Sequence, residues 1–209
     1  MTPPTPGTGA GPVHAGPTIG LFGGTFDPIH RGHVEVAETV RDALGLDRML
    51  VVVANEPWQK QDRPVSPAED RYAMVTAALA DRPGLEASRL ELDRGGPSYT
   101  VDTVHRLLDD EPGANIVVVV GADVVASLDT WHEHEVLREL VTLAVVDRPG
   151  VTVADPPAGW RFTHVAVTPV DVSSTDLRAR LEAGDPVEDA VPDAVIRCLS
   201  ERGLYATRR

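Results

Sequence analysis

The sequence predicts an α/β fold: an open, mostly parallel sheet with helices on both faces. Short apolar runs typical of buried strands alternate with longer segments that have helical periodicity. A glycine-rich loop follows the first apolar run and leads into a helical segment. With 42% hydrophobic and 24% charged residues among 209, the chain can form a substantial globular core. In such sheets, ligands bind at the C-terminal ends of the strands.

Six strands are expected, because six segments are short apolar runs bounded by turn residues. They cover residues 18–22, 49–54, 85–90, 116–121, 142–146 and 164–168. Helices are expected over residues 34–44, from 66 onward, and over 101–108, 133–140, 175–183 and 192–202. The helix at 66 has the clearest start signal, with Ser66 as its cap, Pro67 in its first turn and Glu69 completing a capping box. Gly203 is expected to end the last helix.

The chain is expected to contain one domain. Residues 1–17 are rich in proline, glycine and threonine, so they cannot bury a core and are expected to form a disordered arm. Residues 18–209 are expected to form a single domain.

Charge and cysteine content limit the function classes. The net charge of −13 argues against general nucleic-acid binding, which needs an extended basic face. The single cysteine, Cys198, excludes an internal disulfide, and no apolar run suits a membrane span or a signal peptide. We therefore expect a cytoplasmic protein without a membrane partner. The sequence is compatible with a homo-oligomer but does not set the oligomeric state.

Residues 23–33, which read GGTFDPIHRGH, form the most informative segment. The glycines let the backbone approach an anion, and the helix that opens near His33 directs free N–H groups and its positive dipole end into the same space. His30 and His33 lie three residues apart, so both rings can face bound phosphates. A His-x-x-His pair alone also suits a metal-ligand pair or a solvated helix cap. The whole string favours a phosphate site.

Residues 172–178, VSSTDLR, form a second helix start. Ser173 or Ser174 can cap the helix, Asp176 lies where a capping box needs an acid, and Arg178 adds a forked cation. Taken alone, this segment is also typical of an ordinary capped surface helix.

The two segments together resemble the HxGH nucleotidyltransferases. Residues 24–33 match every fixed position of their Gly-x-Phe-Asp-Pro-x-His-x-Gly-His loop, and 172–178 resemble their Ile-Ser-Ser-Thr-x-Ile-Arg motif. The resemblance covers about residues 18–206 and implies a Rossmann-like fold. Within the superfamily, the chain resembles bacterial nicotinate-nucleotide adenylyltransferases in three segments: PWQK at 57–60, GGPSYTVDT at 95–103, and Gly-Ala-Asp at 121–123 followed by Leu128 and Trp131.

This closer resemblance implies transfer of the adenylyl group of ATP to nicotinate mononucleotide, giving deamido-NAD and pyrophosphate in NAD biosynthesis, with Mg²⁺ bound to the ATP and no dedicated protein ligands for the metal. The catalytic residues that it implies are His30, His33, Lys60 and Arg178. Those implied for ATP are Gly23, Gly24, Thr25, Phe26, His30, His33, Gly121, Asp123, Ser173, Ser174, Thr175 and Arg178. Those implied for the nicotinate nucleotide are Gly24, Thr25, Trp58, Lys60, Tyr99, Thr100, Trp131 and His132.

The resemblance also implies roles. The acceptor's phosphate would attack the α-phosphorus in line, and it needs no strong base because it is already anionic at neutral pH. His33 would donate to the α-phosphate with His30 beside it. Ser174, Thr175 and Arg178 of the second motif would hold the departing pyrophosphate. Trp131 would stack on the nicotinate ring, Thr100 would meet its carboxylate or phosphate, and Asp123 would bind a ribose hydroxyl. An isolated tryptophan is otherwise more typical of core packing.

Lys60 is the only lysine among 19 lysine and arginine residues. Its compact charge suits the acceptor phosphate or the α-phosphate, although chance composition explains a lone lysine equally well. Two residues depart from the family pattern near the acceptor. Glu56 is acidic close to an anionic substrate, and His132 stands where tyrosine is common.

Other functions are open to the same motifs. The acceptor could be nicotinamide mononucleotide or phosphopantetheine, or the chain could be a non-catalytic ATP-binding module. A glycerol-phosphate cytidylyltransferase shares the loop but lacks the middle segments. A class I aminoacyl-tRNA synthetase is disfavoured by the missing lysine-rich motif. A dehydrogenase and a P-loop kinase are disfavoured because their Gly-x-Gly-x-x-Gly and Gly-x-x-x-x-Gly-Lys strings do not follow the first strand.

Overall fold

The structure, a computed structural model, describes residues 16–57, 65–147, 154–168 and 172–205. The predicted arm lies outside the described residues except for its last two positions. Within them, six parallel strands form one sheet. The strands are β1 (Thr18–Gly24), β2 (Arg48–Val53), β3 (Leu85–Ser88), β4 (Asn115–Gly121), β5 (Val141–Asp147) and β6 (Phe162–Ala166). Their order, β3-β2-β1-β4-β5-β6, changes direction between β1 and β4 and is that of a Rossmann-type sheet.

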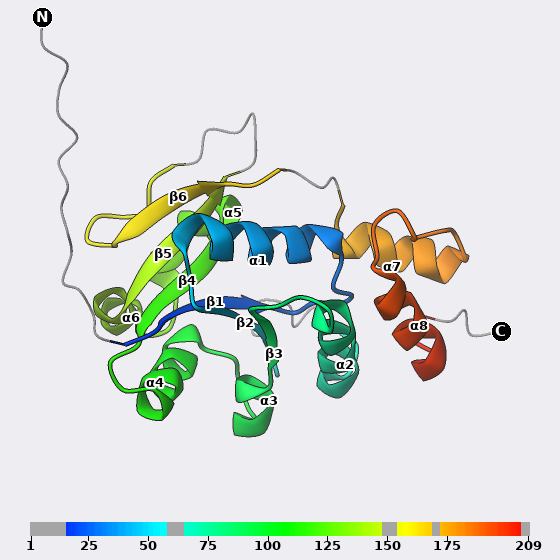
Figure 1. The fold of residues 1–209 in the computed structure, drawn as a ribbon, viewed down its shortest axis with the longest axis horizontal. Coiled ribbons are helices and arrows are strands. Elements are labelled where there is room, and N and C mark those ends of the chain that lie inside the picture. Colours follow the sequence, from blue (N-terminus) through cyan, green and yellow to red (C-terminus); the bar gives the residue numbers. More distant parts are fainter. Residues whose placement is uncertain (1–15, 58–64, 148–153, 169–171, 206–209) are drawn as a thin grey trace, which may run out of the picture.

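Helices cover both faces of the sheet, as predicted. They are α1 (Arg31–Leu44), α2 (Ala68–Leu79), α3 (Leu90–Arg94), α4 (Thr100–Asp110), α5 (Ala122–Val125), α6 (His134–Leu140), α7 (Ser174–Ala183) and α8 (Asp193–Arg202), with a 3₁₀ turn at Leu128–Thr130. Figure 1 shows α1 lying across one face and α3 and α4 on the opposite side, with α7 and α8 together at one end of the molecule.

The core consists of two apolar clusters, one on each face of the sheet. Strand β4 contributes to both because its side chains alternate: Val117 and Val119 enter the cluster under α1, α2 and α8, while Val118 and Val120 enter the cluster under α4 and α6. All of these side chains are buried. A strand buried on both faces has no polar alternation, which is why the continuous apolar run predicts it correctly.

Several local predictions are wrong. The first helix begins at Arg31 and not at residue 34, and the last strand spans Phe162–Ala166 instead of 164–168. The third strand ends at Ser88, before the predicted end at residue 90, because Leu90 begins the short helix α3. Ser66 does not cap α2; the cap position belongs to Pro67, and the Ser66 main chain and hydroxyl bind residues elsewhere in the fold. The prediction for Gly203 is confirmed. It adopts φ 62° and its N–H binds carbonyls of the last turn of α8.

Candidate active site

The loop between β1 and α1, residues 25–30, lies beside the point where the strand order reverses. Its backbone is unusual at two adjacent positions: Phe26 has φ 51°, and the Asp27–Pro28 peptide bond is cis. Gly24 is required just before it. A Cβ at Gly24 would lie 2.6 Å from the Phe26 ring, which occupies the space that a side chain would need. The ring packs edge-on against His33, with 5.1 Å between centroids.

The two histidines of the motif form a stacked pair. Their ring centroids are 3.7 Å apart and the ring planes differ by 24°. The main-chain N–H of His30, which occupies the cap position of α1, donates to Nδ1 of His33 at 3.3 Å. The His30 ring is only 6% exposed and its Nδ1 has no hydrogen-bond partner. Burial lowers the pKa of His30 to about 4, so its ring is neutral at pH 7.

The second motif binds the same loop from α7. Ser173 caps this helix, since its Oγ accepts from the Asp176 N–H at 3.1 Å. The Ser174 hydroxyl donates to the Pro28 carbonyl at 3.1 Å, and Nη1 of Arg178 donates to the Asp27 carbonyl at 2.7 Å. Nη2 of Arg178 also donates to the Thr175 hydroxyl. Two motifs about 150 residues apart are therefore hydrogen-bonded to each other. An ordinary capped surface helix would not make these contacts.

A cavity of about 370 Å³ opens at the C-terminal ends of β1 and β4, where the strand order reverses. It brings together five residues predicted for the nucleotide: Gly23, Gly24, Thr25, Gly121 and Asp123. Gly121 has little room for a side chain, because a Cβ there would meet Oδ1 of Asp123 at 2.6 Å. Of the described residues, the histidine pair and the α7 motif do not line this cavity; they adjoin it through the loop.

The same cavity is also lined by four residues predicted for the acceptor: Tyr99, Thr100, Trp131 and His132. The Tyr99 and His132 rings stack with centroids 4.3 Å apart. Thr100 begins α4, so free N–H groups lie at the cavity. Nε1 of Trp131 is buried without a hydrogen-bond partner.

Glu91, which sequence reasoning missed, lines the same cavity. It lies in α3, is 6% exposed, and accepts a hydrogen bond of 2.7 Å from the Thr103 hydroxyl. Burial raises the pKa of this carboxyl above its ordinary value. Only its place between a predicted strand and the GGPSYT segment could have indicated it, because glutamate in a charged helix usually faces solvent.

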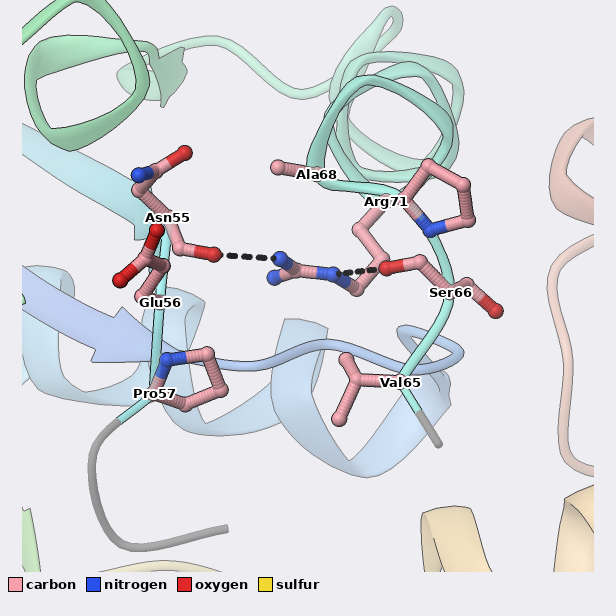
Figure 2. Close-up of a pocket in the computed structure, with 8 residues that line it drawn as sticks. Asn55, Glu56, Pro57, Val65, Ser66, Ala68 and Arg71 are labelled. Carbon is pink, nitrogen blue, oxygen red and sulfur yellow. Dashed lines mark hydrogen bonds between the residues drawn. The ribbon is translucent and has the colours of Figure 1, made fainter. Parts of the chain in front are cut away.

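Arg71, in α2, is the second residue that sequence reasoning missed. It is 1% exposed and donates to three main-chain oxygens: Ser66 at 2.8 Å, Thr25 at 2.9 Å and Asn55 at 3.1 Å. Figure 2 shows the guanidinium between the segments of Asn55 and Ser66, beside a second cavity of about 410 Å³. Arg71 thereby holds the loop at residues 25–30, the predicted phosphate loop, against both segments. No local sequence pattern signals such a buried arginine.

Three predicted positions need separate mention. Trp58 and Lys60 lie outside the described residues. Glu56 is exposed and lines the second cavity, with its main chain beside Pro97. In Figure 2 its carboxylate lies apart from the Arg71 guanidinium. Of the two departures from the family pattern, only His132 therefore lines the cavity of the predicted acceptor residues.

Two searches covered the described residues alone. No group of three or more histidine, cysteine, aspartate or glutamate side chains could hold a metal ion there. None of the helices in this part of the chain combines the length and apolar character needed to cross a membrane.

Comparisons with known proteins agree with the motifs. A family model described as Cytidylyltransferase-like matches residues 21–180. Relatives from Corynebacterium kroppenstedtii and Streptomyces coelicolor are 44% and 45% identical over 90% and 88% of this chain, and over 91% and 98% of their own lengths. Both carry the name probable nicotinate-nucleotide adenylyltransferase.

The fold also matches solved structures. Nicotinic acid mononucleotide adenylyltransferase of Plasmodium falciparum, complexed with NaAD, superposes with a TM-score of 0.75 and 17% identity, over 90% of this chain and 97% of that chain. At this identity the likeness supports the fold alone, and it confirms the Rossmann-like prediction. From the family model and the sequence relatives, the chain belongs to the cytidylyltransferase-like family and, within it, to the nicotinate-nucleotide adenylyltransferases.

Proposed function

We propose that this protein transfers the adenylyl group of Mg–ATP to the 5′-phosphate of nicotinate mononucleotide, forming deamido-NAD and releasing pyrophosphate. The observation that carries the proposal is that one cavity at the strand reversal is lined by residues predicted for both substrates. The glycine end of β1, which continues into the histidine loop, lines it together with Tyr99, Trp131 and the start of α4. The names of the sequence relatives support the same reaction.

The histidine pair has the chemistry to stabilise the α-phosphate. Because Nδ1 of His33 accepts the His30 N–H, a neutral His33 ring carries its proton on Nε2. That N–H would donate to a non-bridging oxygen of the α-phosphate as negative charge accumulates there during attack. His30, neutral because it is buried, would support the ring of His33 by stacking. The acceptor phosphate would act as nucleophile without a general base.

Arg178 and the hydroxyls at the start of α7 would bind the departing pyrophosphate. The α7 N-terminus supplies N–H groups and a positive dipole end, and the guanidinium is already held beside the phosphate loop. Ser173 contributes through its cap. Ser174 keeps the helix in place through its bond to Pro28, so its role would include positioning as well as binding.

The acceptor would lie against the wall formed by Tyr99, Thr100, Trp131 and His132. Trp131, which lines the cavity, would stack on the nicotinate ring. N–H groups at the start of α4 would meet an anionic group, and Asp123 would accept from a ribose hydroxyl. Trp58 and Lys60 stay assigned to the acceptor phosphate from sequence alone.

Mg²⁺ fits this site as part of the substrate. No group of three or more histidine, cysteine, aspartate or glutamate side chains among the described residues could hold a metal ion, and both carboxylate oxygens of Asp27 accept from protein donors. Mg²⁺ binds phosphate oxygens and retains water ligands, so it would arrive with ATP.

Steady-state assays with Mg–ATP and one acceptor at a time test the proposal. We expect pyrophosphate and a product with the mass of deamido-NAD from nicotinate mononucleotide, and much less product from nicotinamide mononucleotide or 4′-phosphopantetheine. If only another acceptor is turned over, the assigned substrate is wrong, but the adenylyl-transfer mechanism still holds. ATP binding without turnover of any acceptor would favour a non-catalytic nucleotide-binding module. Near-normal turnover of His33→Ala at saturating substrate would contradict the role of His33.

A further inference from the structure

Asp27, in the phosphate loop (residues 25–30), accepts hydrogen bonds from three segments that are distant in sequence. Its side chain is 1% exposed. Oδ1 accepts from the Tyr205 hydroxyl at 2.5 Å, and Oδ2 accepts from the Ser66 N–H at 3.4 Å. Its main-chain oxygen accepts from Arg178. The mechanism above uses Arg178 but assigns nothing to Tyr205, which follows α8 near the C-terminus.

Ser66 connects the same groups a second time. Its carbonyl accepts from Nε of Arg71 at 2.8 Å, and its hydroxyl lies 3.3 Å from the Tyr205 hydroxyl. Asp27, Ser66, Arg71 and Tyr205 thus form one polar network beneath the phosphate loop. Arg71 extends the network to the Thr25 carbonyl, at the wall of the cavity. A change at Tyr205 therefore reaches the loop through the Asp27 carboxylate and through Ser66.

Tyr205 has an unusual backbone conformation at the position where its side chain contacts Asp27. Gly203 ends α8, and Tyr205 then adopts φ 57°, a left-handed conformation that residues with a side chain rarely occupy. The side chain is half-buried against the apolar cluster of α1, α2 and α8. Burial raises the pKa of Tyr205 well above its ordinary value, so the hydroxyl stays protonated and donates to Asp27.

We propose that Tyr205 is a positioning residue of the ATP site, which holds the phosphate loop in its binding conformation by donating a hydrogen bond to the Asp27 carboxylate. The inference rests on the proposed function, since it assigns Tyr205 to the loop that would bind ATP. A buried carboxylate that loses a donor must find another or draw in water, and the loop would shift to satisfy it. Binding would then include the free energy of restoring the loop.

A matched control exists on the same helix. Nη1 of Arg202 pairs with Oδ1 of Asp70 at 2.5 Å, an exposed contact that also joins α8 to α2 but does not involve Asp27. Arg202→Met loosens the docking of α8 and leaves the phosphate loop untouched. Tyr205→Phe removes one hydroxyl and keeps the ring in the apolar cluster.

The test is calorimetric titration of each full-length protein with a non-hydrolysable ATP analogue and Mg²⁺, without acceptor, followed by steady-state kinetics. For Tyr205→Phe we expect the Kd of the analogue to rise about tenfold, the typical effect of one hydrogen bond to a charged group. The kcat/KM for ATP should fall by a similar factor, with KM for the acceptor changed by less than about twofold. Arg202→Met should bind the analogue as the unsubstituted protein does.

Two results would overturn the inference: analogue binding by Tyr205→Phe within about twofold of the unsubstituted protein, or equal weakening by Arg202→Met. A double-mutant cycle with Asp27→Asn gives a second measure. The Tyr205→Phe effect should shrink in that background because a neutral amide oxygen accepts a weaker hydrogen bond than the carboxylate, and full additivity would contradict the proposal. Because analogue binding needs no acceptor, failure of the unsubstituted protein to form a dinucleotide would overturn only the proposed function.

Discussion

Nη1 of Arg178 donates a 2.7 Å hydrogen bond to the main-chain oxygen of Asp27, 151 residues earlier in the chain. Through this bond the helix start of the second motif becomes part of the loop of the first. The guanidinium also binds the Thr175 hydroxyl, so its fork is fixed on both sides before any nucleotide arrives. A lysine carries all its donors on one nitrogen, so it cannot reproduce the planar fork that holds these two oxygens and still presents N–H groups to phosphate.

Arg178→Lys should therefore lower kcat/KM for ATP by about 100-fold, the usual cost of losing one positioned donor to a transition-state oxygen. Arg180→Lys is the matched control, because Arg180 lies in the same helix and binds Asp189 on the surface. It should change kcat/KM by less than about twofold. Equal effects of the two substitutions would show that α7 acts only through its stability.

Arg71→Met should destabilise the fold by roughly 3 kcal/mol, because it leaves one buried and two partly buried carbonyls without their donor. Urea unfolding measures this change. The control is Arg89→Met, which removes exposed ion pairs with Glu69 and Asp93 and should lower the urea midpoint much less than Arg71→Met does. An Arg71→Met protein as stable as the control would mean that water satisfies these carbonyls.

The sequence predicts the six strands and their two helical layers because buried parallel strands leave an unbroken apolar pattern. It fails for α3 and α5, which are too short to show periodicity. It also fails for Ser66, where a residue suited to cap a helix binds a distant carboxylate instead. Arg71 and Tyr205 leave no local pattern, because their partners lie far away in sequence and only the folded chain brings them together.

Stability should depend on His30 between pH 4 and 6.5. An unfolded histidine takes up a proton near pH 6.5, whereas His30 in the fold does so only near pH 4, so the unfolded state binds more protons in this window. Stability therefore rises with pH across it, by about 3 kcal/mol from this group. His30→Gln should remove that part of the slope. The exposed His105→Gln should retain it, and parallel Tm profiles for both variants would contradict the burial of His30.

Glu91 should act in the opposite direction. Its folded pKa is raised above the unfolded value of 4.5, so the folded state binds more protons between the two pKa values. Its contribution is fully present below pH 4.5 and is lost as pH rises through the folded pKa. The Tm of Glu91→Gln relative to the unsubstituted protein should thus increase with pH over this range. Glu135→Gln, an exposed change in α6, should show no such trend.

Trp131 should affect the acceptor and leave ATP alone. Trp131→Leu should raise KM for nicotinate mononucleotide by about tenfold, the order expected for a lost stacking contact, with KM for ATP unchanged. Trp131→Phe keeps an aromatic face, so its KM for nicotinate mononucleotide should lie between those of the unsubstituted protein and Trp131→Leu. Similar increases in both KM values would assign Trp131 to core packing.

The competition among acceptors tests the central claim most directly. In this assay the three acceptors compete at equal concentration for limiting Mg–ATP: nicotinate mononucleotide, nicotinamide mononucleotide and 4′-phosphopantetheine. The ratios of the products then give the ratios of kcat/KM. We expect deamido-NAD to dominate by at least about 100-fold, since a wall of positioned donors should discriminate the ring carboxylate from the amide. Products in nearly equal amounts, or dominance of another acceptor, would contradict the assignment of this cavity to nicotinate mononucleotide.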